Sequence, residues 1–152
     1  MSDDLKARAL RLLARREHTR AELARKLAPD AGSPEALEAL LGQLEARKHL
    51  SDERYAEARA HQLSRKFGAA RIRRELVAKG IARETAARFA AGAEKSDLER
   101  ARSMLERKYR APAAASKERA RRARFLQSRG FSLDVIRSAL DNFRTGATEE
   151  SP

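Results

Sequence analysis

The sequence predicts an all-α protein: a tandem array of three three-helix repeats, each similar to a helix-turn-helix, in an elongated and curved arrangement. Alanine and leucine supply 31 and 18 of the 152 residues, and both favour helix over strand. Apolar residues recur at helical spacing in nine segments. A basic helix that ends in a glycine turn recurs after 50 residues, at 71–79 and at 119–129, which indicates an internal repeat whose units stack on their neighbours.

The first repeat is expected in residues 1–50. Its first helix covers 3–16, where apolar residues are three and four apart. A Thr-x-x-Glu capping box that begins at Thr19 predicts a second helix at 20–27. A third helix is expected to start at Pro34, because proline suits the first helical position and a capping serine precedes it.

The middle repeat is expected in residues 51–95. Its first helix runs from a cap at Ser51 or Asp52 to about residue 66, and its last covers about 82–91. The helix between them is predicted at 69–79. Gly80 follows it directly, where a left-handed C-terminal cap favours glycine.

The third repeat is expected in residues 96–144, and residues 145–152 are expected to be a disordered tail. Ser96 is predicted to cap the first helix through a capping box, and Ser116 to cap the second. The last helix is predicted to begin at Leu133.

Three turn segments in the chain have similar sequences, at 48–55, 79–86 and 129–136. Each contains a basic residue, a turn residue, an apolar residue, a small residue and then an acid in the first turn of the next helix. Each is expected to join the second or third helix of a repeat to its successor.

The sequence offers little for catalysis. There is no cysteine, and none of the histidines, His18, His49 and His61, has a histidine four residues away, so no transition-metal site is expected. Neither the phosphate-binding G-x-x-x-x-G-K-[ST] motif nor the nucleophile motif G-x-S-x-G occurs. We therefore expect a protein that is not an enzyme and has no cofactor.

Location in the cytoplasm is expected, with no contact to a membrane. The acidic start of the chain has no apolar segment of the kind found in signal peptides. No apolar run approaches the ~20 residues that a membrane span needs. The lack of cysteine fits a reducing compartment.

The formal net charge is +12, which favours a polyanionic partner: nucleic acid first, then an anionic membrane surface or an acidic protein. The excess of basic over acidic residues rises from 2 in residues 1–50 to 4 in residues 51–100 and 6 in residues 101–152. The partner is therefore expected to meet the middle and C-terminal parts.

Two basic helices supply the candidate contact residues. Arginine binds phosphate or carboxylate through two parallel hydrogen bonds. The alternative is that these cations pair with local acids, chiefly Glu75 and Glu118. Few Asn, Gln or Ser side chains accompany them, so phosphate contacts are expected rather than base readout. The candidates are Arg71, Arg73, Arg74, Lys79, Arg119, Arg121, Arg122, Arg124 and Arg129.

Nearly the whole chain resembles RecX, the bacterial regulator of the RecA recombinase. The departures are Phe67, where tyrosine is common, and Ala69 with Ala70, where proline or arginine often lies. The segments that carry the resemblance are 9–23 (ALRLLARREHTRAEL), 52–57 (DERYAE), 67–76 (FGAARIRREL), 79–81 (KGI), 124–126 (RFL) and 129–132 (RGFS), with Ile136.

The resemblance implies three tandem repeats and no catalysis. It implies a modulator, mainly an inhibitor, that binds in the groove of the filament of RecA on single-stranded DNA and suppresses ATP hydrolysis, strand exchange and coprotease activity. DNA repair and the SOS response would be regulated in this way. The alternative is a general DNA-binding helical protein that acts on single-stranded DNA directly, with double-stranded DNA as a further candidate. A monomer is expected in either case.

Overall fold

The computed structural model describes residues 2–113 and 115–143. Within these residues the chain forms nine α-helices, one short 3-10 helix and no strand. The elements are α1 (Ser2–Arg15), α2 (Arg20–Leu27), η1 (Ala28–Asp30), α3 (Pro34–Ala46), α4 (Asp52–Leu63), α5 (Ala69–Ala78), α6 (Arg83–Glu94), α7 (Asp97–Lys108), α8 (Ser116–Ser128) and α9 (Leu133–Asp141).

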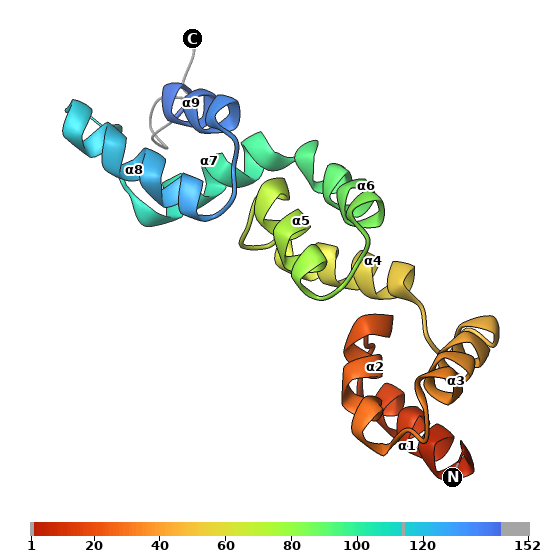
Figure 1. The fold of residues 1–152 in the computed structure, drawn as a ribbon. Helices are drawn as coiled ribbons and strands as arrows, with labels where there is room; N and C mark the ends of the chain where they lie inside the picture. The colour runs from red at the N-terminus through yellow and green to blue at the C-terminus, as the bar shows by residue number, and fades with distance from the viewer. Residues whose placement is uncertain (1, 114, 144–152) are drawn as a thin grey trace.

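The helices form three groups that follow one another along an elongated body, with α1–α3 at one end, α4–α6 in the middle and α7–α9 at the other end (Figure 1). We call these groups the first, middle and third repeats. Each has its own hydrophobic cluster. The prediction of an all-α tandem array is confirmed, whereas the domain boundaries at residues 50 and 95 stay predictions. The predicted tail lies outside the described residues.

The cores of the first and middle repeats differ in the size of the side chains that fill them. The first contains six buried leucines besides Leu5 and Ala9. Half of the ten buried residues of the middle core are alanines, and the larger side chains are Tyr55, Leu63, Ile72, Leu76 and Ile81. Because alanine buries little apolar area, this core gains less free energy from burial than the leucine core does.

The helix caps confirm most of the local predictions. Thr19 and Glu22 form the expected capping box at α2, and the hydroxyls of Ser33 and Ser51 accept hydrogen bonds at the starts of α3 and α4. Gly80 follows α5 with a φ of 94°. In that region L-residues are strained, which accounts for glycine there.

Two capping predictions are wrong. Ser96 has a φ of −111° and a ψ of 9°, so its backbone is not extended as a capping residue requires. Its hydroxyl donates instead to the carbonyl of Ala93. Ser116 lies inside α8, and Ala115 occupies the cap position.

The three similar turn segments are not equivalent in the fold. Those at 79–86 and 129–136 join the second and third helices within a repeat, α5 to α6 and α8 to α9. The one at 48–55 joins α3 to α4, and so connects the first repeat to the middle one. The left-handed position in this turn is held by Lys48, with a φ of 65°, and not by His49, the residue that aligns with Gly80 and Gly130 of the other two turns.

Candidate binding surface

The second helices of the three repeats, α2, α5 and α8, dock end to end. At the first joint, the hydroxyl of Thr19 before α2 donates to the carbonyl of Lys79 at the end of α5, at 2.6 Å. At the second joint, the backbone N–H of Gly68 before α5 donates to the carbonyl of Arg129 at the end of α8, at 2.7 Å. The positive N-terminal end of one helix therefore meets the negative C-terminal end of the next.

An aspartate from the first helix of the following repeat completes each joint. Asp52 on α4 accepts a hydrogen bond from the N–H of Arg20 at 2.7 Å, and Asp97 on α7 accepts one from the N–H of Ala69 at 3.2 Å. Both aspartates therefore satisfy an otherwise free N–H in the first turn of a helix in the preceding repeat. These roles were not predicted from the sequence, although Ser-Asp occurs at both positions.

The candidate residues on α5 divide into two groups. Arg71 donates to Glu75 at 3.2 Å and to the carbonyl of Ser128 at 3.2 Å, so its guanidinium belongs to the second joint. The side chains of Arg73, Arg74 and Lys79 are exposed. No acidic side chain in the described part of the chain forms an ion pair with these three.

On α8, Arg122 is buried, with only 6% of its surface exposed. It donates to the carbonyl of Ala111 at 2.6 Å and to Glu118 at 3.1 Å, and its guanidinium lies 4.1 Å from the centre of the Tyr109 ring. This placement does not fit the prediction that Arg122 meets a partner. Its long side chain holds the connection between α7 and α8 instead.

The other α8 candidates are more accessible. Arg121 pairs with Glu118 at 3.4 Å, and Arg119 pairs with Asp141 on α9. Only Glu118 was expected from the sequence as a local acid, because the approach of α9 is a tertiary feature. Arg124 is exposed, and among the described residues it has no ion-pair partner.

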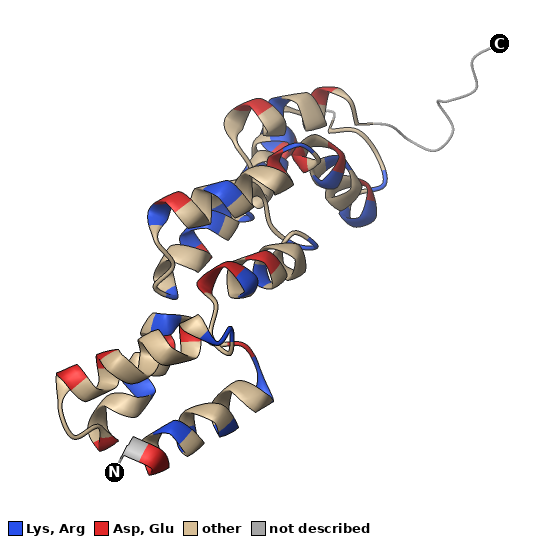
Figure 2. Cartoon of the chain, turned by 90° about the vertical axis from the view of Figure 1, so that its right-hand side faces the viewer, with Lys and Arg blue, Asp and Glu red and all other residues tan. Residues whose placement is uncertain are grey.

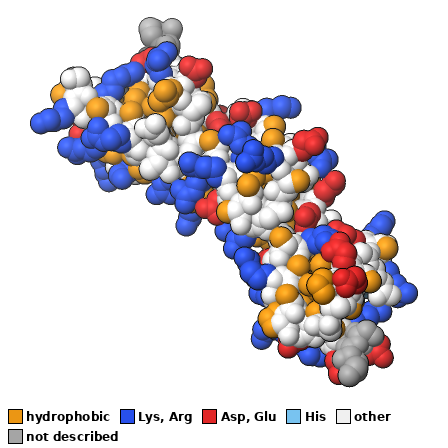
Figure 3. All heavy atoms as spheres, in the orientation of Figure 1, with side chains coloured by type: hydrophobic (Ala, Val, Ile, Leu, Met, Phe, Trp, Pro, Cys, Tyr) orange, Lys and Arg blue, Asp and Glu red, His pale blue; other side chains and the backbone are white. Residues whose placement is uncertain are grey.

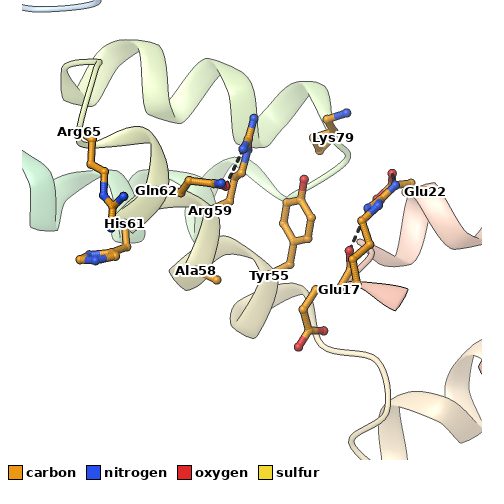
Figure 4. A pocket seen from close by; sticks show the side chains of 10 residues that line it. Glu17, Glu22, Tyr55, Ala58, Arg59, His61, Gln62, Arg65 and Lys79 are labelled. Atoms are coloured by element: carbon orange, nitrogen blue, oxygen red, sulfur yellow. Dashed lines mark hydrogen bonds and ion pairs between the residues drawn. The ribbon is translucent and has the colours of Figure 1, made fainter. Parts of the chain in front are cut away.

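A polar pocket lies between the first and middle repeats (Figure 4). The Tyr55 side chain lies between Arg59 and Glu22 in this view. Arg59 donates to Gln62 at 2.7 Å, and Arg16 pairs with Glu22 at 2.6 Å. The hydrogen bond from Arg16 lowers the pKa of Glu22 to about 2, so this carboxylate is charged at neutral pH. Burial raises the pKa of Tyr55.

Of the three histidines, His18 is buried, whereas His49 and His61 are exposed. Burial lowers the pKa of His18, whose ring lies 3.0 Å from the Lys26 amine, so the neutral imidazole is favoured there. Among the described residues, no group of three or more His, Asp or Glu side chains is placed to hold a metal ion. None of the described helices combines the length with the apolar character that a membrane span needs. Basic segments occur on all three repeats, interleaved with acidic ones (Figure 2).

Comparison with known proteins gives one consistent family. Models of the first, second and third three-helix domains of RecX match residues 6–44, 51–88 and 95–140. The regulatory protein RecX of Leptothrix cholodnii is 49% identical over 90% of this chain and 87% of its own. That of Neisseria meningitidis serogroup C is 42% identical over 90% and 88%.

Two solved structures show the same fold. A crystal structure of RecX from Lactobacillus salivarius has a TM-score of 0.80 at 19% identity, and covers 93% of this chain and 96% of its own. A second, described as regulatory protein RecX, has a TM-score of 0.75 at 23% identity, covering 92% and 73%. The three domain matches and the similar relatives together show that the chain belongs to the RecX family of regulatory proteins.

Proposed function

We propose that this chain regulates the RecA recombinase, mainly as an inhibitor, by binding in the groove of the filament that RecA forms on single-stranded DNA. The observation that supports the proposal most is the end-to-end docking of α2, α5 and α8, which makes one elongated body from three repeats (Figure 1). Such a body can contact several filament subunits at once, and contacts linked in this way strengthen one another.

The exposed cations are the proposed contact residues. Arg73, Arg74, Lys79 and Arg124 are exposed, without an ion pair to any described acid, so binding a phosphate or carboxylate breaks no internal contact of theirs. A partner held across filament subunits would oppose the rearrangements of ATP hydrolysis, and thereby strand exchange and coprotease activity. The proposed location is the cytoplasm and the proposed state is a monomer.

The test is ATP hydrolysis by RecA on single-stranded DNA with increasing amounts of this protein. We expect inhibition at or below one molecule per RecA subunit, and at least tenfold more protein needed after Arg73→Ala with Arg74→Ala. The matched control is Arg83→Ala with Arg137→Ala, which removes the same charge from two other exposed arginines. No inhibition by the unaltered protein across the titration would refute the proposal.

Co-sedimentation separates this function from simple DNA binding. The protein is mixed with RecA filaments, with bare DNA, or with free RecA. Tighter binding to filaments than to bare DNA supports regulation through the filament. Equal affinity for bare DNA and filament would favour the general DNA-binding alternative.

A further inference from the structure

We propose that the cleft between the middle and third repeats binds the phosphodiester backbone of one nucleic-acid strand, without sequence preference and without RecA. The cleft has a volume of about 230 Å³. Its cations come from three places: Arg65 and Lys66 after α4, Arg107 and Lys108 at the end of α7, and Arg129 after α8. No acidic residue lines it, whereas the pocket between the first and middle repeats contains Glu17 and Glu22.

These five cations are not used in internal ion pairs with any acidic residue that the structure describes. Many other arginines are, including Arg71, Arg119 and Arg121 of the predicted contact set. Only Arg129 of the five was a candidate from the sequence. The other four were not predicted, because they lie outside the two basic helices and converge only when the repeats dock.

Helix-end electrostatics do not account for the cluster. The C-terminal ends of α4, α7 and α8 carry about half a negative charge each, which basic residues in a last turn commonly offset. Three such ends give about one and a half negative charges against five cations. The remaining positive charge is available to a ligand, and it lies in a concave site, where fields are concentrated.

Aromatic rings hold two of the cation heads in place. The Lys108 amine lies 4.2 Å from the centre of the Phe125 ring, and the Arg129 guanidinium lies 5.3 Å from the same ring and 5.8 Å from that of Phe67. Cations over ring faces are attracted by the ring quadrupole. Because these two side chains are already ordered, less conformational entropy is lost when a ligand binds, which favours affinity.

The position of Arg65 favours a chain-like polyanion over a single anionic group. This arginine lines both the cleft and the pocket between the first and middle repeats, which also contains Arg59 and Lys79. Lys and Arg side chains accordingly gather along the edge of the molecule where the third repeat meets the middle one (Figure 3). A flexible strand with a charge at every residue can follow such a line of cations.

The size and lining of the cleft define the class of nucleic acid. A space of about 230 Å³ is large enough for the phosphates of one strand, and a flexible strand can follow the cations from this cleft to the next pocket more closely than a stiff duplex can. Cations lie over the partly buried rings of Phe67 and Phe125, and they compete there with any stacking base. Contacts to phosphate alone carry no sequence information.

The proposal is tested by fluorescence anisotropy of labelled oligothymidylate and oligoadenylate with the full-length protein, over a range of salt concentrations and without RecA. The test variant is Arg65→Ala with Arg107→Ala, and the control is Arg83→Ala with Arg137→Ala, which has the same net charge. We expect the test variant to bind about tenfold more weakly. The slope of log affinity against log salt should fall by about 1.4, at about 0.7 per lost contact to a single strand.

Further variants and competitors separate a nucleic-acid site in the cleft from a general effect of charge. Arg65→Lys with Arg107→Lys should keep the salt slope, and circular dichroism should show unchanged helix content for every variant. Equal weakening by the control pair, or no weakening by the test pair, would overturn the proposal. Competition by polyglutamate as effective as that by oligonucleotide would also overturn it, in favour of an acidic protein. Because RecA is absent, a negative result leaves the proposed filament function standing.

Discussion

The two joints between repeats share one geometry but use different chemistry. In both, the start of one second helix meets the end of the next, and an aspartate of the following repeat accepts an N–H from that start. The first joint is closed by the hydroxyl of Thr19, and Asp52 is half-buried. The second is closed by the backbone of Gly68, and Asp97 is buried. The docking of helix ends is thus the same at both joints, while the side chains that complete it differ.

The aspartate of the second joint forms an ion pair, whereas Asp52 of the first joint has none with any cation that the structure describes. Asp97 pairs with Arg100, whose guanidinium also donates to the carbonyls of Ser64, Phe67 and Ala93. Asp52 makes one hydrogen bond, to the N–H of Arg20. Removing each acid therefore has different consequences for the cation or the backbone left behind.

Asp97→Ala should have the largest effect of any single substitution at the joints. The Arg100 side chain, which is 18% exposed, loses its carboxylate, and breaking a largely buried pair by removing one partner costs about 3–5 kcal/mol. Asp52→Ala should cost about 1 kcal/mol, as the loss of one helix cap does. Urea unfolding followed by circular dichroism measures both. Equal losses would show that the two joints are energetically alike.

The glycine turns at the two joints are enclosed by different atoms. A Cβ at Gly130 would lie 2.3 Å from the Arg71 Cβ and 2.6 Å from the Arg71 backbone nitrogen. A Cβ at Gly80 would lie 2.4 Å from the Ala21 Cβ, with the next atom 3.8 Å away. At the second joint an added Cβ would therefore meet backbone atoms, whereas at the first it would meet a single methyl group.

Gly130→Ala should accordingly lower the free energy of unfolding more than Gly80→Ala, by about 3 against about 2 kcal/mol from left-handed strain and overpacking. Adding Ala21→Gly should relieve the contact part of Gly80→Ala, about 1 kcal/mol. Arg71→Gly should not rescue Gly130→Ala, because the backbone nitrogen remains. Chemical denaturation of the single and double variants tests this; a rescue at Arg71 as large as that at Ala21 would contradict it.

The fold could be predicted from the sequence because its signals are local. Alanine and leucine content, 3.6-residue spacing, the Thr19 capping box and Gly80 are all read within a few residues. Ser96 failed as a cap because the helix start there is fixed by a contact of Asp97 with the N–H of Ala69, 28 positions earlier. No local pattern reports such a contact.

The candidate site was predicted less completely. The basic character of α5 and α8 was evident, but the spacing of arginines on α8 does not reveal that Arg122 is buried under Tyr109. Nor does it reveal that Asp141 reaches Arg119. Burial and pairing across helices depend on how α7, α8 and α9 pack, and only the structure supplies that.

Acid should weaken the neighbourhood of the first joint. Glu22 has a folded-state pKa of about 2, below its ordinary value, so its stabilisation is present above that ordinary value and is lost as the pH falls towards 2. Burial raises the pKa of Asp97 at the second joint. Asp97 therefore binds a proton more readily in the folded protein than in the unfolded chain, so its protonation at low pH does not lower the free energy of unfolding.

We expect a loss of about 2 kcal/mol between about pH 5 and pH 2 from Glu22, less than the full pKa shift implies because Arg16 is half exposed to solvent. Amide hydrogen exchange should show the start of α2 losing protection before the start of α5. Glu22→Gln should flatten this dependence. Earlier loss of protection at α5 would mean that the second joint, not the first, is the acid-sensitive one.

The smallest effect is expected at the surface of the first joint. Arg54 pairs with Glu17 across that joint, and their side chains are 44% and 37% exposed. Arg54 also donates to the carbonyls of Lys48 and His49, but these hydrogen bonds are exposed, so water can replace them. Solvent and salt screen the ion pair, so Arg54→Ala should cost about 0.5 kcal/mol, and less at high salt. Arg100→Ala at the second joint should cost several times more and change little with salt, because it leaves Asp97 buried without its cation. Denaturation at low and high salt measures both; a salt-insensitive loss at Arg54 as large as that at Arg100 would mean that the first joint is held as firmly as the second.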